Sequence, residues 1–268
     1  MLTDADVERW LREDVGHHDV TNHVPGDTGG RLVAKESGVV AGLAAATAVF
    51  DYLDVGVETP VESGDRIDPG DVVLRTDGPA RETLRGERVA VNLAGHASGV
   101  ATKTRAAVDA ARTVEDDVRV ACTRKTTPGL RGIEKRAVAA AGGDTHRLDL
   151  SHTVMVKDNH VAEMGLESAV AHFRERASFT TKIEVEVETP ERAPEAAAAG
   201  ADIVLLDNMS PDETARAVDL VDGAALTEAS GGLTVADVPD YAATGVDVLS
   251  MGSLTHSAPT LDLSFRTG

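Results

Sequence analysis

The second half of the chain alternates between short β-rich runs and alanine-rich helical segments, and this alternation constrains the fold more than any other feature. From residue 115 onward the β-rich runs are 118–122, 148–156, 182–187, 202–206, 224–227 and 246–250. A sustained series of βα units predicts a parallel sheet and favours a βα barrel, with a doubly wound open sheet as the alternative. The two common nucleotide-binding fingerprints, GxGxxG after a first strand and the P-loop pattern, are absent from the sequence.

The first half of the chain has a different rhythm, with helical and strand patterns of mixed length. We expect an amphipathic helix, two strands separated by an alanine-rich helix, tight hairpins at two Gly-Asp turns, and a helical stretch interrupted near Gly95 to Gly99. In that order, the segments are 3–13, 31–40, 55–59, 61–75 and 79–114. The hairpins are similar to those of lipoyl-type carrier domains, but no lysine stands at a hairpin tip, so we interpret them as turns only.

The composition indicates a folded protein and argues against several partners. Of the 268 residues, 42% are apolar, which excludes general disorder. The N-terminus has no basic and apolar leader pattern, and no apolar run approaches a membrane span, so we expect a soluble cytoplasmic protein. Cys122, the one cysteine, stands in an apolar run and is expected to be buried and inert. It cannot form an internal disulfide.

The charge balance is strongly acidic, with 45 acidic against 26 basic residues and a formal charge of −19. This excess, together with one Trp, two Tyr and four Phe, argues against a nucleic-acid module. The abundant acids, the scarce lysine and the plentiful alanine resemble a protein adapted to high salt, and an ordinary acidic enzyme is the alternative. Residues 124–157 oppose the trend, because basic residues outnumber acidic ones there.

Polar residues gather at the ends of the predicted strands, where parallel α/β folds bind their ligands. Cations belong to the early strands, carboxylates to the middle strands, and Gly/Ser turns to the last two. In chain order the residues are Thr123, Arg124, Lys125, His146, Arg147, Lys157, Glu184, Glu186, Asp207, Asn208, 228–232 and 251–256. This order predicts three subsites in one pocket.

Each subsite has a functional interpretation and a plainer alternative. Arginine forks and lysines suit a ligand with several carboxylates or phosphates, whereas surface ion pairs are the alternative, which we expect for Glu134, Lys135 and Arg136. Glu186 and Asp207 could hold Mg²⁺ with phosphate oxygens, or could pair with neighbouring bases. The turns at 230–232 and 252–253 offer backbone N–H groups to a phosphate, although a Gly-Gly pair is often only a turn.

The remaining histidines carry no recognisable pattern. His17, His18 and His23 share a polar loop without the spacing of metal ligands, and we expect them to be solvated. His152 and His160 flank an apolar run, and neither a catalytic triad nor a zinc pattern surrounds them.

Nearly the whole chain resembles the quinolinate phosphoribosyltransferase family, also called nicotinate-nucleotide pyrophosphorylases (carboxylating), of NAD biosynthesis. The matching segments come in order and with compatible gaps. They are ER (87–88), N (92), HASGVAT (96–102), TRKTTPGLR (123–131), HR (146–147), VKDNH (156–160), EVE (184–186), LDN (206–208), EASGG (228–232) and MGS (251–253). The resemblance implies a glycosyltransferase that joins quinolinate to the phosphoribosyl group of phosphoribosyl pyrophosphate and releases CO₂.

The resemblance also implies an architecture and roles for individual residues. It implies an N-terminal α/β sandwich domain (1–114, joined by the tail at about 257–268) and an incomplete parallel βα barrel (115–256). A homodimer, alone or within a higher oligomer, would share Arg88 across its interface. The implied quinolinate ligands are Arg88, Arg124, Lys125, His146, Arg147 and Lys157; Glu186 and Asp207 face the ribose and Mg²⁺; and Ser230, Gly231, Gly232, Gly252 and His256 lie toward the 5-phosphate. Lys125 or Lys157 would assist the departing pyrophosphate or protonate the ring.

Three rival functions remain open at this point. A ModD-like paralogue associated with molybdenum transport shares much of the motif series and acts on another substrate. Nicotinate phosphoribosyltransferase takes a substrate with one carboxylate, which does not require so many cations. A sensor that binds phosphoribosyl ligands without turnover predicts loss of the carboxylates on the metal side, yet Glu186 and Asp207 are both present.

Overall fold

The computed structural model describes residues 2–268, which form two compact units. The first unit comprises residues 2–105, 127–142 and 258–268, and the second comprises 106–126 and 143–257. The domain limits expected from the sequence, 1–114 with the C-terminal tail and 115–256, stay a prediction. Compared with those limits, residues 106–114 belong to the second unit and residues 127–142 to the first.

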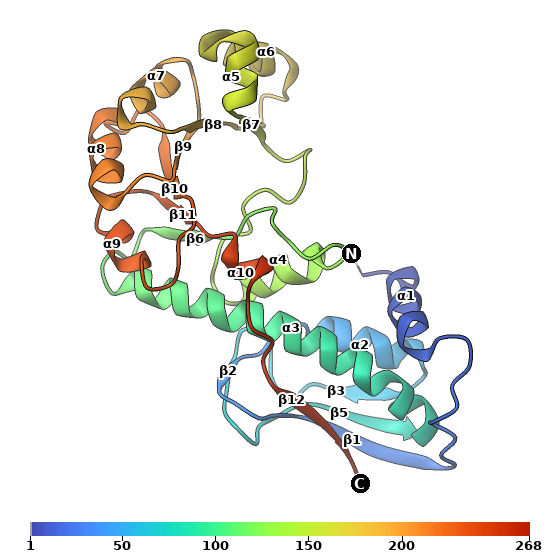
Figure 1. Cartoon of the computed structure of the whole chain (residues 1–268). Coiled ribbons are helices and arrows are strands. Elements are labelled where there is room, and N and C mark those ends of the chain that lie inside the picture. Colours follow the sequence, from blue (N-terminus) through green and yellow to red (C-terminus); the bar gives the residue numbers. More distant parts are fainter. Residues whose placement is uncertain (1) are drawn as a thin grey trace. The chain divides into compact units, whose positions relative to one another are not determined.

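The first unit consists of helices packed with a small antiparallel sheet (Figure 1). Its elements are α1 (Asp4–Val15), β1 (Asp27–Ala34), β2 (Gly38–Val39), α2 (Leu43–Tyr52), β3 (Gly56–Glu58), β4 (Arg66–Ile67), β5 (Val72–Pro79), α3 (Ala80–Arg112, which continues into the second unit), α4 (Arg131–Ala140) and β12 (Leu263–Thr267). The four-stranded sheet has the order β12-β1-β5-β3, and β2 pairs with β4. Its core packs Leu32 and Leu74 of the sheet against Phe50 of α2 and Ala90 of α3.

The helix α3 runs without a break from Ala80 to Arg112, so the predicted interruption near Gly95 and Gly99 is wrong. The glycines serve close packing instead. A Cβ on Gly99 would lie 1.9 Å from the carbonyl oxygen of Pro259, and the amide of Leu261 donates a hydrogen bond to the carbonyl of Gly95 at 3.0 Å. The C-terminal segment therefore lies directly against this helix, and only glycine leaves room for its backbone.

The second unit contains a six-stranded, wholly parallel sheet with the order β6-β11-β10-β9-β8-β7. Its strands are β6 (Arg119–Ala121), β7 (Val154–Val156), β8 (Ile183–Val187), β9 (Ile203–Asp207), β10 (Leu226–Ser230) and β11 (Val248–Ser250). Its helices are α5 (Asp158–Met164), α6 (Leu166–Arg176), the 3-10 helix η1 (Pro190–Arg192), α7 (Ala193–Ala198), α8 (Pro211–Val221), α9 (Val238–Ala242) and α10 (Ser253–His256). The sheet is curved, with β6 and β7 as its two edges, which confirms the predicted fold class of an incomplete βα barrel (Figure 1).

Each predicted β-rich run contains a strand, but two runs are displaced. The run 148–156 is strand only at its end, because Leu148 and Leu150 are 46% and 77% exposed and belong to a loop. The run 224–227 starts two residues before β10 and stops three residues before its end. The apolar pattern marks where a strand is buried, whereas polar residues at its carboxyl end, such as Ser230, extend the strand beyond that pattern.

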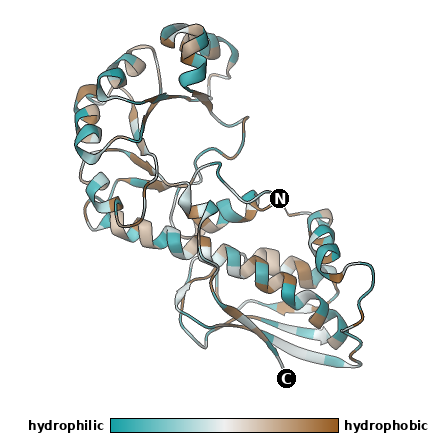
Figure 2. Cartoon of the chain, viewed as in Figure 1, coloured by the Kyte–Doolittle hydropathy of each residue, from teal (hydrophilic) through white to brown (hydrophobic). Residues whose placement is uncertain are grey.

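The two faces of the parallel sheet differ in chemistry. Val185, Val204 and Leu206 pack into a core with alanines and valines of α6, α7 and α8. These three helices cover the outer face of the sheet (Figure 1). These helices carry both hydrophilic and hydrophobic stretches, as expected of helices with one side on a core (Figure 2). Successive residues of a strand face opposite sides, so Glu184 and Glu186, which alternate with Val185, point to the inner face. No helix within residues 2–268 is long and apolar enough to cross a membrane.

Candidate active site

Strand register places the predicted carboxylates of the second unit on one face of the sheet. Glu186 pairs with Leu205, and Leu205 pairs with Glu228. Asp207 lies two residues beyond Leu205 and pairs with Ser230. Since paired residues share a face and alternate residues return to it, these side chains all point to the inner face. The predicted carboxylate and Gly/Ser subsites therefore belong to neighbouring strands of one sheet.

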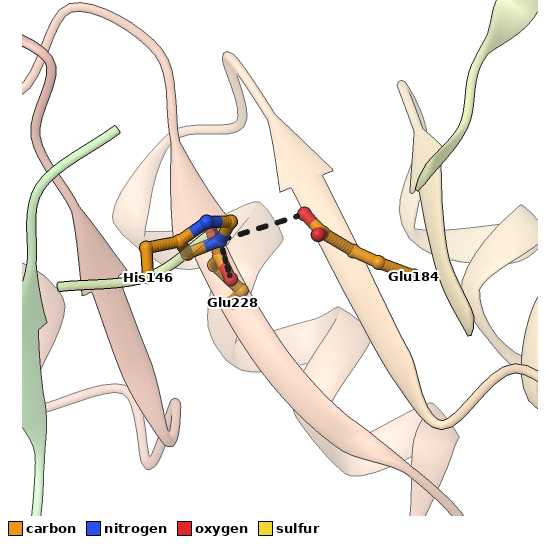
Figure 3. Close-up of side chains that lie close together, drawn as sticks. All are labelled: His146, Glu184 and Glu228. Carbon is orange, nitrogen blue, oxygen red and sulfur yellow. Dashed lines mark hydrogen bonds and ion pairs between the residues drawn. The ribbon is translucent and has the colours of Figure 1, made fainter. Parts of the chain in front are cut away.

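His146 is held at the centre of a buried acidic pair (Figure 3). Its Nε2 lies 3.1 Å from Oε2 of Glu228 on β10 and 3.8 Å from Oε1 of Glu184 on β8. Glu184 and Glu228 are 0% and 2% exposed. Arg147, the next residue, brings its Nε to 3.9 Å from Oε2 of Glu184 and its Nη2 to 2.9 Å from Sδ of Met155. Two cations of the predicted dicarboxylate subsite thus lie against two buried carboxylates.

The local backbone explains why His146 lies there. Asp144 extends the sheet next to β6, since its amide donates to the carbonyl of Val120 and its carbonyl accepts from the amide of Cys122. Its side chain then accepts a hydrogen bond from the amide of His146 at 2.7 Å, and His146 adopts a left-handed φ of 50°. Non-glycine residues in this conformation are uncommon and cluster at functional sites.

Burial and charge shift the proton affinities within this cluster. Burial raises the pKa of Glu184 to about 7, with a further contribution from the charge of Glu228, and His146, Arg147 and Lys157 only partly oppose it. Burial alone would lower the pKa of His146. The hydrogen bond and charge of Glu228, together with the charge of Glu184, outweigh burial and raise that pKa above its ordinary value. Glu228 and Glu184 thus favour the protonated, positively charged form of His146.

The predicted metal carboxylates already have partners within the chain. Nζ of Lys157, at the start of α5, lies 2.5 Å from Oε2 of Glu186, and Asn208 donates from Nδ2 to Oδ2 of Asp207 at 2.7 Å. The alternative that Glu186 pairs with a base therefore holds in this structure. Both carboxylates are only partly buried at strand ends, and carboxylate oxygens are ligands that Mg²⁺ accepts. The donor set fits a hard divalent cation.

The turn after β10 is fixed by close packing against Asn208. Gly231 has φ 109°, and a Cβ there would lie 2.4 Å from Oδ1 and 2.7 Å from the amide nitrogen of Asn208. Asn208 itself has φ 57°, a conformation that asparagine tolerates better than most residues. Ser230 donates from Oγ to the carbonyl of Ser250 at 3.4 Å. This packing brings Asp207 and the Ser230–Gly232 turn together.

The cationic loop after β6 contacts the last turn of the sheet. Thr255 donates from Oγ1 to the carbonyl of Lys125 at 2.6 Å. A Cβ on Gly252 would lie 3.0 Å from Cδ of Lys125, 3.3 Å from Oγ1 of Thr123 and 3.3 Å from Cδ2 of His256. Lys125, Gly252 and His256 are therefore neighbours. Arg124 is partly buried, and within residues 2–268 its Nε has no hydrogen-bond partner.

Arg88, one of the predicted quinolinate ligands, belongs to the first unit, where it is exposed on α3.

Two other groups of residues were interpreted incompletely or wrongly from the sequence. Glu184 and Glu228 were predicted only as polar residues of strand ends without individual roles, although a charged residue inside an apolar strand is a signal of function. The prediction of surface ion pairs is wrong for Glu134 and Lys135, which are 0% and 4% exposed. Glu134 accepts from the amide of Thr127 at 3.2 Å and lies 2.8 Å from Nε2 of His96, so it organises the loop after Thr126. Cys122 is buried, as predicted.

Comparisons with known proteins match both parts of the chain. Family models described as quinolinate phosphoribosyl transferase match in two pieces, the N-terminal domain over residues 19–98 and the C-terminal domain over 100–266. A probable nicotinate-nucleotide pyrophosphorylase (carboxylating) of Methanothermobacter thermautotrophicus is 44% identical and covers 97% of both chains. The human nicotinate-nucleotide pyrophosphorylase (carboxylating) is 43% identical over 97% of this chain and 90% of its own length.

Solved structures agree over the same length. The crystal structure of NadC from Streptococcus pyogenes superposes with a TM-score of 0.91 at 42% identity and covers 99% of this chain and 97% of its own. The nicotinate-nucleotide pyrophosphorylase of Francisella tularensis gives a TM-score of 0.94 at 28% identity, covering 100% and 98%. Sequence, fold and domain order agree, and the chain belongs to the quinolinate phosphoribosyltransferase family.

Proposed function

We propose that this chain transfers the phosphoribosyl group of phosphoribosyl pyrophosphate to the ring nitrogen of quinolinate and releases pyrophosphate and CO₂, giving nicotinate mononucleotide for NAD biosynthesis. Family membership supports the reaction. The observation that carries the proposal is the charge arrangement of the second unit. Cations of the early strand ends share one sheet with Glu186 and Asp207 on its inner face, so a dicarboxylate and a metal-bound pyrophosphate can be held side by side.

Quinolinate would be bound by the cationic side chains. Arg124, Lys125, His146, Arg147 and Lys157 from this chain supply hydrogen-bond donors with positive charge, and Arg88 of a second copy would complete the set. Guanidinium forks bind carboxylates bidentately, whereas lysine acts as a point charge. A ligand with two carboxylates uses more of these donors than a ligand with one, so the subsite favours quinolinate over nicotinate.

Phosphoribosyl pyrophosphate would lie toward the carboxylates and the glycine turns. Glu186 and Asp207 would hold Mg²⁺, which when bound would offset the charge of the departing pyrophosphate. Lys157 is already paired with Glu186 and would be shared between that carboxylate and the substrates. Ser230, Gly231, Gly232, Gly252 and His256 would face the 5-phosphate, since the backbone of these turns can approach a phosphate closely.

The chemistry needs no protein nucleophile. The bond from the anomeric carbon to the pyrophosphate oxygen breaks with its electron pair on oxygen, and the lone pair of the pyridine nitrogen forms the new bond. Glu186 and Asp207 would stabilise the oxocarbenium character between these events. The pyridinium charge then lets the adjacent carboxylate leave as CO₂, and the electron pair left on the ring carbon takes up a proton. Lys125 and Lys157 are the candidate proton donors.

The proposal includes an assembly, a metal and a location. A homodimer would bring Arg88 of one subunit to the strand ends of the other, and Mg²⁺ would be the one metal required. A biosynthetic enzyme of this kind would work in the cytoplasm, in keeping with the finding on membrane-spanning helices. Adaptation to high salt stays a prediction from the acidic composition.

Calorimetric binding to the Arg124→Ala variant tests the quinolinate subsite. We expect quinolinate affinity to fall about tenfold to a hundredfold, because a charged hydrogen-bonding partner is worth roughly 1.5 to 3 kcal/mol. Binding of phosphoribosyl pyrophosphate with Mg²⁺ should stay close to wild type. Unchanged quinolinate affinity would overturn the role of Arg124. Wild-type protein that binds both ligands without turnover would instead indicate a sensor, and consumption of another heterocycle would indicate the ModD-like paralogue.

A further inference from the structure

Two carboxylates lie on the inner face of the sheet, and the proposed reaction uses neither of them. Glu228 and Glu184 are almost wholly buried, and they approach the same imidazole from β10 and β8 (Figure 3). Within residues 2–268, Oε1 of Glu228 and both oxygens of Glu184 have no hydrogen-bond partner. Burying a carboxylate in this way is costly unless a nearby cation compensates it or it takes up a proton, as the raised pKa of Glu184 indicates for that group. Glu228 in particular therefore calls for a cation in contact.

The imidazole of His146 is the group that meets this requirement most directly. Its Nε2 is 3.1 Å from Glu228 and 3.8 Å from Glu184, while Arg147 reaches only Glu184, at 3.9 Å. The charged groups that face His146 are therefore Glu228 from β10, Glu184 from β8 and the neighbouring Arg147. Glu228 is the only one of them within hydrogen-bond distance, so it controls both the orientation and the charge of the ring.

The other ring nitrogen of His146, Nδ1, indicates what the positive charge of the ring is used for. Nδ1 of His146 is buried and, within the described residues, has no hydrogen-bond partner. The hydrogen bond from its amide to Asp144 accompanies a backbone φ of 50°, and the hydrogen bond to Glu228 orients the ring with Nε2 toward that carboxylate. With Nε2 committed to Glu228, an imidazolium has one N–H left, and a buried N–H requires an acceptor.

We propose that Glu228 is a positioning residue that keeps His146 protonated, so that Nδ1–H of the imidazolium serves as a charged donor to a carboxylate of the pyridine dicarboxylate. This inference rests on the proposed function, because it assigns the acceptor to quinolinate. The raised pKa of His146 agrees with it. A neutral imidazole could still donate one hydrogen bond. However, the energy of a hydrogen bond from a charged donor to a carboxylate is about twice that of a neutral one.

The conservative variant Glu228→Gln tests the proposal, because it keeps the shape and an acceptor oxygen while removing the charge. With ¹⁵N-labelled histidine, the nine histidines can be followed by NMR against pH, and loss of one signal in His146→Gln assigns His146. We expect the His146 midpoint to fall by about 1 pH unit or more in Glu228→Gln. At a pH between the variant and wild-type midpoints of His146, the KM for quinolinate should rise about tenfold, and below the variant midpoint it should recover, while kcat and the KM for phosphoribosyl pyrophosphate change by less than about threefold.

The matched control is Glu191→Gln, which removes an exposed carboxylate paired with Arg216 and should leave the His146 midpoint and both KM values unchanged. A purely structural role for Glu228 would lower activity equally at all pH values without moving the midpoint, and that result would overturn the proposal. If Glu228→Gln does not fold, the same NMR titration on wild-type protein still tests the proposal. A His146 midpoint at or below that of a free histidine, or an Nδ1 signal that does not respond to quinolinate, contradicts the proposal. The NMR arm needs no turnover, so it separates this inference from the reaction itself.

Discussion

Replacing the buried Glu184 by glutamine should change how the stability of the protein depends on pH. The folded protein holds the proton of Glu184 up to pH about 7, whereas the unfolded chain releases it near the ordinary pKa of 4.5. Below pH 4.5 both states are protonated, and the group contributes nothing to the pH dependence. As pH rises from 4.5 through 7, the folded state progressively loses stability relative to the unfolded chain.

The magnitude follows from these two pKa values. Each pKa unit corresponds to about 1.4 kcal/mol, so a rise from 4.5 to about 7 removes at most about 3 kcal/mol of unfolding free energy. A glutamine at this position would not ionise, so the variant would not lose this amount. The stability of Glu184→Gln relative to wild type should therefore increase by up to about 3 kcal/mol between pH 4.5 and pH 8, which corresponds to about 6 to 12 °C in Tm.

Thermal unfolding followed by circular dichroism at several pH values measures the effect. The exposed control Glu191→Gln accounts for the general influence of net charge, which is large in a chain of formal charge −19. The difference in Tm between Glu184→Gln and wild type should grow with pH, while that of the control stays flat. A difference that is constant across this pH range would refute the reasoning, because Glu184 would then be ionised throughout or protonated throughout.

Two further variants test the turn and the assembly. Gly231→Ala should cost about 1 to 3 kcal/mol and weaken binding of phosphoribosyl pyrophosphate, because its Cβ would meet Asn208 and its φ is positive; near-normal affinity and Tm would show that the turn adapts. Arg88→Ala and Arg124→Ala dimers would be mixed, allowed to exchange subunits, and assayed at quinolinate too dilute for either variant to turn over. They should regain about a quarter of wild-type activity, since half of the dimers would carry one intact site. Failure to regain activity after proven exchange would contradict a shared site.

The parallel sheet could be predicted because each strand has its own local signature. Residues 183–187 alternate apolar and acidic side chains, and residues 203–206 form a continuous apolar run, so both indicate strands without knowledge of their neighbours. The uninterrupted α3 could not be predicted, because the reason for Gly95 and Gly99 lies in a segment more than 150 residues further along the chain. Glycine that breaks a helix and glycine that admits a neighbouring backbone look the same in a sequence.

The sequence could suggest which residues form the site, and that membership stays a prediction, but it could not suggest their contacts. Lys125 and Asp207 were selected from the carboxyl ends of apolar runs, His146 from the start of one, and Glu186 from within one. The pairing of Glu228 with His146 depends on a left-handed residue in a loop and on the register of β10, and neither has a local signal. Contacts between distant segments are therefore the part of the site that required the structure.

The central claim is the reaction itself, and its product stoichiometry tests it most directly. Purified protein in molar salt would be given quinolinate, phosphoribosyl pyrophosphate and Mg²⁺, with nicotinate mononucleotide followed by mass spectrometry and CO₂ released from the ring carboxylate followed in parallel. We predict one nicotinate mononucleotide for each CO₂, and loss of both products when Mg²⁺ or either substrate is omitted. Folded protein that binds both substrates but forms neither product would contradict the account.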